Sequence, residues 1–298
     1  MIELFGVILI EGLIYGIMAL GVFISFRVLD FPDLTVDGSF PMGAAVMAAC
    51  LIGEVPFFLA FVITFIAGIL AGMTTAVIHN KLKVPGLLAG ILTMTMLYSV
   101  NLRIQKFRPN ISFLRIDTIF DRISAFFNDY ISSTWSVLLL LLILVLVIKI
   151  ILDLFFHTDM GLTLGAMGNN EQMVISQGVN PRLLKMLGIG LSNGLVAISG
   201  ALAAQYQGQA DVNLGRGVVI MGLASVMIGE FLIKSNKIAL LTLRVLMGSI
   251  AFRGIMFLAR NLTFLSLRPS DLQLIYGLSI VLLLIITGRK EKKRKRAV

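Results

Sequence analysis

The stretch that decides how this chain is organised is His157–Pro181, HTDMGLTLGAMGNNEQMVISQGVNP. It is polar and rich in glycine, and it separates two apolar runs, Ser136–Phe156 and Leu183–Ala204. Each of these runs is long enough to cross a bilayer as a helix. A polar segment of this length between two such runs is typical of a part of a membrane protein that contacts something soluble.

The middle of this stretch predicts a short helix. Asn169 or Asn170 suits the N-cap, and Glu171 suits the first turn. Gly178 suits the C-terminal cap, and Pro181 suits the first position of the next helix. We interpret this segment as a docking helix offered to a soluble partner.

The composition excludes an ordinary soluble domain. Of 298 residues, 58% are hydrophobic and 14% are charged, and the mean hydropathy is +0.96. A soluble domain carries about 25% charged residues. Repeated apolar runs without strand-type alternation predict an all-α polytopic membrane protein of about eight to ten crossings, in one transmembrane domain over residues 1–298.

The predicted spans follow one another closely along the chain. They are Leu4–Phe26, Asp33–Leu51, Pro56–Ile78, Leu87–Arg103, Ser136–Phe156, Leu183–Ala204, Val218–Ile233, Ile238–Leu258 and Leu272–Thr287. Asp33–Leu51 is short for a crossing and contains Pro41 and Gly43, so it is expected to be a broken or re-entrant helix. Residues 104–134 are expected to form an external amphipathic segment at a membrane surface or over the mouth of a pathway.

Charge predicts the orientation. The net charge is +9, and residues 288–298 form a basic tail directly after an apolar run. Such a run can bind nucleic acid, but next to a membrane span it marks the cytoplasmic side. Counting back from a cytoplasmic C-terminus places 157–181 in the cytoplasm and the N-terminus outside. Lys106, Arg108, Arg115 and Arg122 would then lie outside, against the positive-inside trend.

Several classes of chemistry lack their sequence signature. No G-x-x-x-x-G-K-[ST] phosphate loop and no H-E-x-x-H motif is present, and no G-x-S-x-G elbow stands out, so neither an intramembrane enzyme nor a metal site is expected. The chain has one cysteine, Cys50, and two histidines, His79 and His157. Glu230 is the only acidic residue well inside a late span, which disfavours a carrier with its own coupling-ion site. A transporter subunit that depends on a separate energy source fits best.

Two regions resemble the membrane-spanning subunits of ABC importers of the branched-chain amino acid and ribose type. One is GLIYGIMALG at residues 12–21, and the other contains TDMG at 158–161, AMGNN at 166–170 and GVN at 178–180, followed by LSNGLVAISGALAAQ. The run FRVLDFPDLTVDGSF at 26–40 further resembles a subgroup of tryptophan/tyrosine permeases and permeases of uncharacterised substrate.

The resemblance implies a mechanism. Residues 157–181 would form a cytoplasmic coupling loop that sits on an ATP-binding subunit, which uses the ATP, while this chain binds no cofactor. A homodimer in the inner membrane of a bacterium would receive a small solute, an aromatic or branched-chain amino acid, from an external substrate-binding lipoprotein. The residues expected to act in ATPase coupling are Gly168, Asn170, Glu171, Gly178 and Asn180.

Polar residues inside the predicted spans are the candidates for the substrate path. They are Asp37, Ser39, Thr93, Tyr98, Asn101 and Asn193. Each has an alternative: hydroxyl and amide groups also serve helix packing, and Asp37 suits a helix N-terminus without any transport role. An ion-coupled secondary transporter and a non-transporting membrane scaffold remain alternatives for the whole chain.

Overall fold

The computed structural model describes residues 2–114, 116–127, 132–235, 237–261 and 277. The basic tail at 288–298 and nearly all of the predicted span Leu272–Thr287 lie outside the described residues, as does Arg115. The described part is helical except for short connections and one two-stranded sheet.

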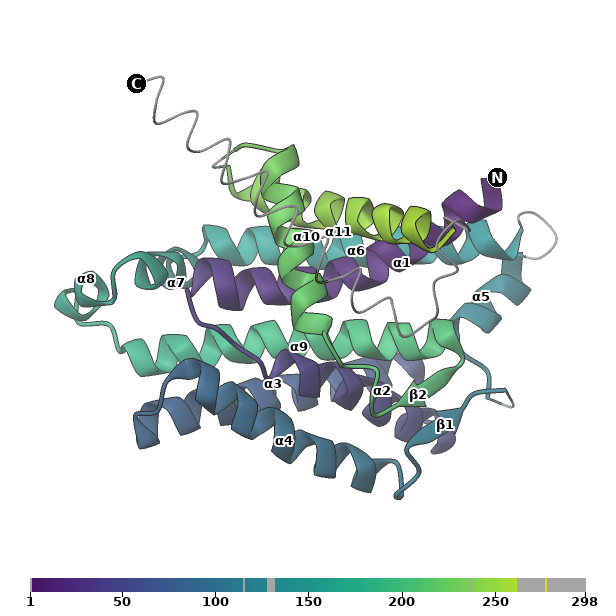
Figure 1. The fold of residues 1–298 in the computed structure, drawn as a ribbon, viewed down its shortest axis with the longest axis horizontal. Coiled ribbons are helices and arrows are strands. Elements are labelled where there is room, and N and C mark those ends of the chain that lie inside the picture. Colours follow the sequence, from purple (N-terminus) through teal and green to yellow (C-terminus); the bar gives the residue numbers. More distant parts are fainter. Residues whose placement is uncertain (1, 115, 128–131, 236, 262–276, 278–298) are drawn as a thin grey trace.

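The elements follow in chain order. They are α1 (Ile2–Val22), which continues as the π-helix η1 (Phe23–Val28), α2 (Val36–Ile52), α3 (Phe57–Leu82), α4 (Gly86–Ile104), β1 (Asn110–Ser112), α5 (Ile119–Phe127), α6 (Ser133–His157), α7 (Asp159–Asn169), α8 (Glu171–Ser176), α9 (Pro181–Gln207), β2 (Gln209–Asp211), α10 (Val218–Leu232) and α11 (Ile238–Asn261). Most of the long helices lie side by side, and α10 crosses them steeply (Figure 1).

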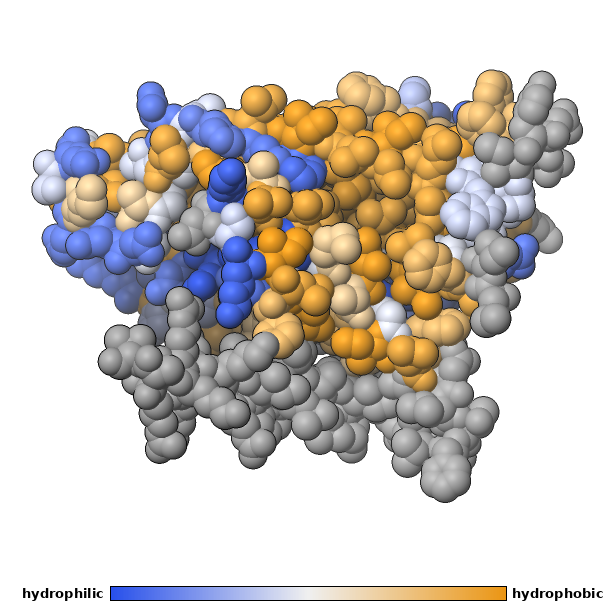
Figure 2. All heavy atoms as spheres, turned by 90° about the horizontal axis from the view of Figure 1, so that it is seen from above, coloured by the Kyte–Doolittle hydropathy of each residue, from blue (hydrophilic) through white to orange (hydrophobic). Residues whose placement is uncertain are grey.

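The helices have the lengths and composition of membrane spans. In the described residues, six are long and apolar enough to cross a membrane, and α2 and α10 are shorter apolar helices. Figure 2 shows a broad hydrophobic belt over the middle of the molecule and hydrophilic residues gathered at the end where α7 and α8 lie. The predicted all-α polytopic membrane fold is confirmed.

Helix α9 forms the centre of the bundle. It packs against α1, α2 and α3. In its most apolar stretch of 18 residues 78% are buried inside the molecule, whereas the corresponding share in α6 is 22%. Pro181 occupies the first turn of α9, as predicted, and the side chain of Asn180 caps the helix by accepting a hydrogen bond from the Arg182 N–H. The helix ends at Gly208, whose φ is +69°.

The chain turns back into the molecule before α2. The link from η1 to α2 leaves the neighbourhood of α7, and α2 begins in the middle of the bundle (Figure 1). From Val36 the helix is continuous through Pro41 and Gly43. The irregular backbone expected inside Asp33–Leu51 therefore lies before the helix, at residues 29–35, and not at the proline.

Two features at opposite ends of the bundle frame the helices. At one end, β1 pairs antiparallel with β2, with Asn110 opposite Asp211, and α5 packs on α6 (Figure 1). We call this the ladder end. At the other end α7 and α8 project from the bundle, and we call it the α8 end. The strands and the separate helix α7 have no counterpart in the sequence-based expectations, whereas the amphipathic segment does contain a helix, α5.

Glycines allow α2 and α9 to touch along their backbones. A Cβ atom added at Gly43 would collide with the carbonyl of Ala197, and one at Gly200 would collide with the carbonyl of Phe40. Close approach through small residues is the usual way in which helices associate in lipid. These two positions fix the crossing that holds α2 against the central helix.

We expect Gly43→Val and Gly200→Val each to lower the free energy of unfolding by about 1–3 kcal/mol or more, because backbone atoms cannot yield as side chains do. Thermal unfolding of the detergent-purified protein measures the change. Gly165→Ala in α7 is the matched control, since nothing lies within 4 Å of a Cβ built there. If the Gly200→Val protein unfolds at the same temperature as the native protein, α2 and α9 do not make this close backbone contact.

Candidate functional site

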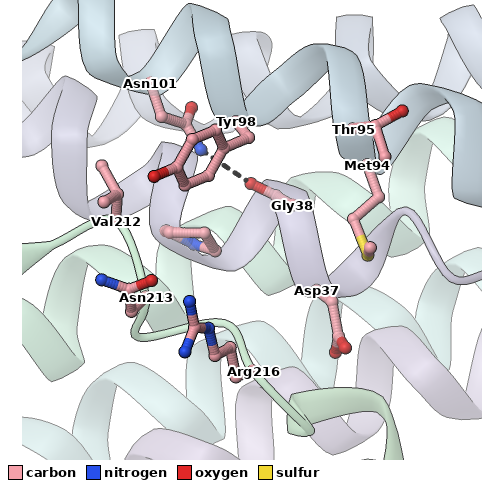
Figure 3. A pocket seen from close by; sticks show the side chains of 10 residues that line it. Asp37, Gly38, Met94, Thr95, Tyr98, Asn101, Val212, Asn213 and Arg216 are labelled. Carbon is pink, nitrogen blue, oxygen red and sulfur yellow. Dashed lines mark hydrogen bonds between the residues drawn. The ribbon is translucent and has the colours of Figure 1, made fainter.

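A cavity of about 320 Å³ lies between the start of α2, the middle of α4 and the loop before α10. Its volume is at the lower end of the range of about 300–1,000 Å³ typical of small-molecule sites. Figure 3 shows the side chains that converge on it. They are those of Asp37, Pro41, Met94, Thr95, Tyr98, Asn101, Val212, Asn213 and Arg216, together with the backbone of Gly38.

Asp37 joins α2 to α10 at the floor of this cavity. Its Oδ1 accepts a hydrogen bond of 2.9 Å from the Val219 N–H, and its Oδ2 accepts one of 3.3 Å from the Gly217 N–H. The carboxylate thus satisfies free amides at the N-terminus of α10, where the helix dipole also favours a negative charge. Asp37 does suit a helix N-terminus, but the helix that it caps is α10.

Asn101 joins α4 to α2. Its Nδ2 donates a hydrogen bond of 3.2 Å to the carbonyl of Gly38, drawn as a dashed line in Figure 3. Its Oδ1 is buried and has no partner among the described residues. Tyr98, one turn earlier on the same helix, also lines the cavity and is 48% exposed. The cavity therefore brings together Asp37, Tyr98 and Asn101 of the six predicted path residues.

Ser39 and Asn193 belong to a different, fully buried cluster. Ser39 Oγ donates to Asn193 Oδ1 at 2.7 Å, and Asn193 Nδ2 donates to Asp33 Oδ2 at 2.6 Å. Asp33 Oδ1 accepts from the Thr35 N–H at 2.9 Å. All four residues are 0% exposed. These contacts favour a packing role for Ser39 and Asn193, since they hold the irregular segment 29–35 against α9.

Thr93 lies on the buried side of α4. Its hydroxyl donates to the carbonyl of Ala89 in the same helix at 3.0 Å. Thr93 is 1% exposed and does not line the cavity, and its donor already has a partner in its own helix. Arg216 and Asn213, in contrast, line the cavity from the turn between β2 and α10 but are not among the predicted path residues. No local signal marks them, because the pairing of β2 with β1 brings that turn over α2.

The coupling residues predicted at the α8 end shape the loop. Asn170 Oδ1 accepts from the Met173 N–H at 3.2 Å and caps α8, and Glu171 pairs with Lys185 of α9 at 3.0 Å. Gly178 has a φ of +80°, so a side chain there would be strained.

Gly168 packs against the carbonyl of Val28 in η1, and Asn180 caps α9. The predicted short helix is present, and the five predicted residues build it or attach it to the bundle. Its exposed apolar surface comes instead from Met173, which is 50% exposed, and Ile175, which is 44% exposed.

Long apolar helices around a small cavity that carries both signs of charge define an integral membrane protein suited to solute passage. A family model described as the permease component of branched-chain amino acid transport systems matches residues 4–287. The chain belongs to this family, and the resemblance seen in the sequence is confirmed. It is a permease component of a transport system and not an enzyme.

Relatives along most of the chain support this assignment. The chain is 39% identical to a tyrosine transport system permease protein of Clostridioides difficile (strain R20291), over 92% of this chain and 88% of the relative. It is 35% identical to an uncharacterized protein of Rickettsia prowazekii (strain Madrid E), over 94% and 96%. It is 24% identical to a ribose import permease protein of Haemophilus influenzae, over 69% and 62%. No solved structure matches the chain.

The buried cluster predicts that replacing Asn193 destabilises the protein more than replacing Thr93 does. Asn193→Leu leaves the Asp33 carboxylate and the Ser39 hydroxyl without their side-chain partner, so we expect the free energy of unfolding to fall by about 1–3 kcal/mol. Thr93→Val is the control and should cost less than about 1 kcal/mol, because the Ala89 carbonyl keeps its backbone hydrogen bond. Thermal unfolding in detergent measures both. Equal losses would show that Asn193 does not hold the cluster.

Proposed function

We propose that this chain is the membrane-spanning subunit of a binding-protein-dependent ABC importer that translocates an aromatic amino acid, with tyrosine as the first candidate. The observation that carries the proposal is the 39% identity over 92% of the chain with a tyrosine transport system permease protein. The cavity at α2, α4 and α10 is the candidate passage, because three of the polar residues expected on the path lie there together with Arg216.

The energy is supplied by a separate ATPase that binds the α8 end. The full sequence contains no phosphate-binding loop of its own. Helices α7 and α8 project from the bundle at this end (Figure 1), and α8 presents Met173 and Ile175 to solvent. An exposed apolar pair on a short, capped helix fits a groove on a protein partner.

Glu230 supports an ATPase over an ion-coupled mechanism. Its Oε1 accepts hydrogen bonds from Arg27 Nε at 2.7 Å and from Arg244 Nη2 at 3.0 Å. A carboxylate that already pairs with two guanidinium groups has its charge engaged within the protein. The acidic residue with which an ion-coupled carrier would be built is therefore engaged in a structural ion pair.

The α8 end is the cytoplasmic end in this proposal, and the membrane is the inner membrane of a bacterium. Lys185 pairs with Glu171, and the carbonyl of Arg182 accepts from Asn80 at the end of α3, so these basic residues lie at this end close to Lys81. Basic residues favour the cytoplasmic side. Two copies of the chain form the transport pathway, and a substrate-binding lipoprotein delivers the solute at the ladder end.

We expect the complete complex in proteoliposomes, with its ATPase and its delivery protein, to take up radiolabelled tyrosine only when ATP is present inside the compartment that holds the ATPase. A protonophore should leave the initial rate unchanged. Uptake by this chain without any ATPase, abolished by an ionophore, would identify an ion-coupled carrier instead. ATPase activity that no solute changes would favour a scaffold.

The docking surface gives a second expectation. The double substitution Met173→Asp and Ile175→Asp should reduce co-purification of the ATPase to less than a tenth, because two charges would be buried in an apolar contact. Leu114→Asp is the matched control, since Leu114 is 92% exposed but lies near the ladder end. If the double variant co-purifies the ATPase as well as the native protein does, α8 is not part of the contact with the ATPase.

A further inference from the structure

The cavity at α2, α4 and α10 carries one charge of each sign. Asp37 and Arg216 lie on the same side of it, and Tyr98 and Met94 lie on the side formed by α4 (Figure 3). Arg216 is exposed, and within the described part of the chain its side chain makes no ion pair and no hydrogen bond. The hydrogen bonds that Asp37 accepts from the Gly217 and Val219 N–H groups use one lone pair on each carboxylate oxygen, and each oxygen has more than one.

The loop that carries Arg216 is held in place before any ligand arrives. Asp37 anchors the amides of Gly217 and Val219 that follow it. Asp211 Oδ1 accepts from the Asn213 N–H at 2.8 Å, and the Arg216 N–H donates to the carbonyl of Asn213 at 3.2 Å. A charged group on such a fixed loop loses less conformational entropy when it binds a ligand.

The opposite wall has a different character. Tyr98 and Met94 of α4 offer a ring and a thioether, and the same helix places Thr95 and Asn101 at the cavity. Pro41 and Val212 add apolar surface on the elements that carry Asp37 and Arg216. Aromatic rings pack well against tyrosine and methionine side chains. The α4 wall of the cavity is therefore uncharged, and both charged side chains, Asp37 and Arg216, lie on the elements that face it.

We propose that this cavity binds the zwitterionic head group of an amino acid, with the carboxylate on Arg216, the ammonium group on Asp37 and the side chain against Tyr98 and Met94. The inference rests on the proposed function and adds the contacts that would recognise the solute inside the membrane. Guanidinium and carboxylate groups match in geometry and form two parallel hydrogen bonds. An ammonium group meets a carboxylate that the start of α10 already keeps in position.

The charges also predict which solutes the cavity rejects. A site built to bind charged groups discriminates strongly against an analogue that lacks one of them, because its own polar groups are then left without a partner. Tyramine has no carboxylate, and 3-(4-hydroxyphenyl)propionate has no ammonium group. Both analogues should therefore bind more weakly than tyrosine, each for a different reason.

The experiment measures binding of radiolabelled tyrosine to the permease–ATPase complex by scintillation proximity, without the delivery protein, so that the selectivity of that protein does not enter. Unlabelled tyrosine, tyramine and the propionate compete in parallel. The variants are Arg216→Gln and Arg216→Lys, and Arg108→Gln is the matched control, an exposed arginine that does not line the cavity. Melting temperatures confirm that every variant is folded, and uptake with the delivery protein is measured separately.

We expect Arg216→Gln to raise the Kd for tyrosine at least tenfold and to leave tyramine nearly unaffected, so that the preference for tyrosine over tyramine disappears. Arg216→Lys should recover part of the affinity, and Arg108→Gln should match the native complex. Native uptake of tyrosine combined with an unchanged Kd in Arg216→Gln, or with equal losses for tyrosine and tyramine, overturns this inference alone. Absence of tyrosine uptake by the native complex overturns the proposed function on which it rests.

Discussion

The hydrogen bonds around Asp33 are the constraint on which the rest of this molecule depends. In an apolar interior, every backbone group outside a helix must find a partner in the protein. The buried carboxylate accepts from the Thr35 N–H and from Asn193, and Asn193 in turn accepts from Ser39. These contacts let the chain reverse among the helices and begin α2 in the middle of the bundle. Without that early start, there would be no polar helix terminus beside α10 and no cavity.

Local signals predicted the α8 end well. Capping by Asn170, the positive φ of Gly178 and the proline that opens α9 depend on a few neighbouring residues each, and the sequence displays them directly. The membrane class follows from composition in the same way. What the sequence did not display is the β1–β2 ladder, because Asn110 and Asp211 are about a hundred positions apart and neither strand is long enough to show a pattern.

The path candidates divide for a similar reason. Hydropathy marks a polar residue in a span but does not tell whether it meets another polar side chain or a cavity. Ser39 and Asn193 face each other across the α2–α9 contact, whereas Tyr98 and Asn101 border open space. Arg216 could not be predicted as a cavity residue, because a charged residue in a polar turn is ordinary and carries no sequence signal of a site. Only the long-range pairing of the strands turns it into a cavity residue.

The two ends of α10 are both held by one short piece of chain. Arg27, at the end of η1, pairs with Glu230 near the C-terminus of the helix, and Asp37 caps its N-terminus. The nine residues between Arg27 and Asp37 connect the two anchors, and α10 rises about 1.5 Å per residue between them. An insertion or deletion in residues 29–35 would put the two anchors out of register. The length of this connection is therefore constrained as well as its composition, unlike that of an ordinary loop, which tolerates changes in length.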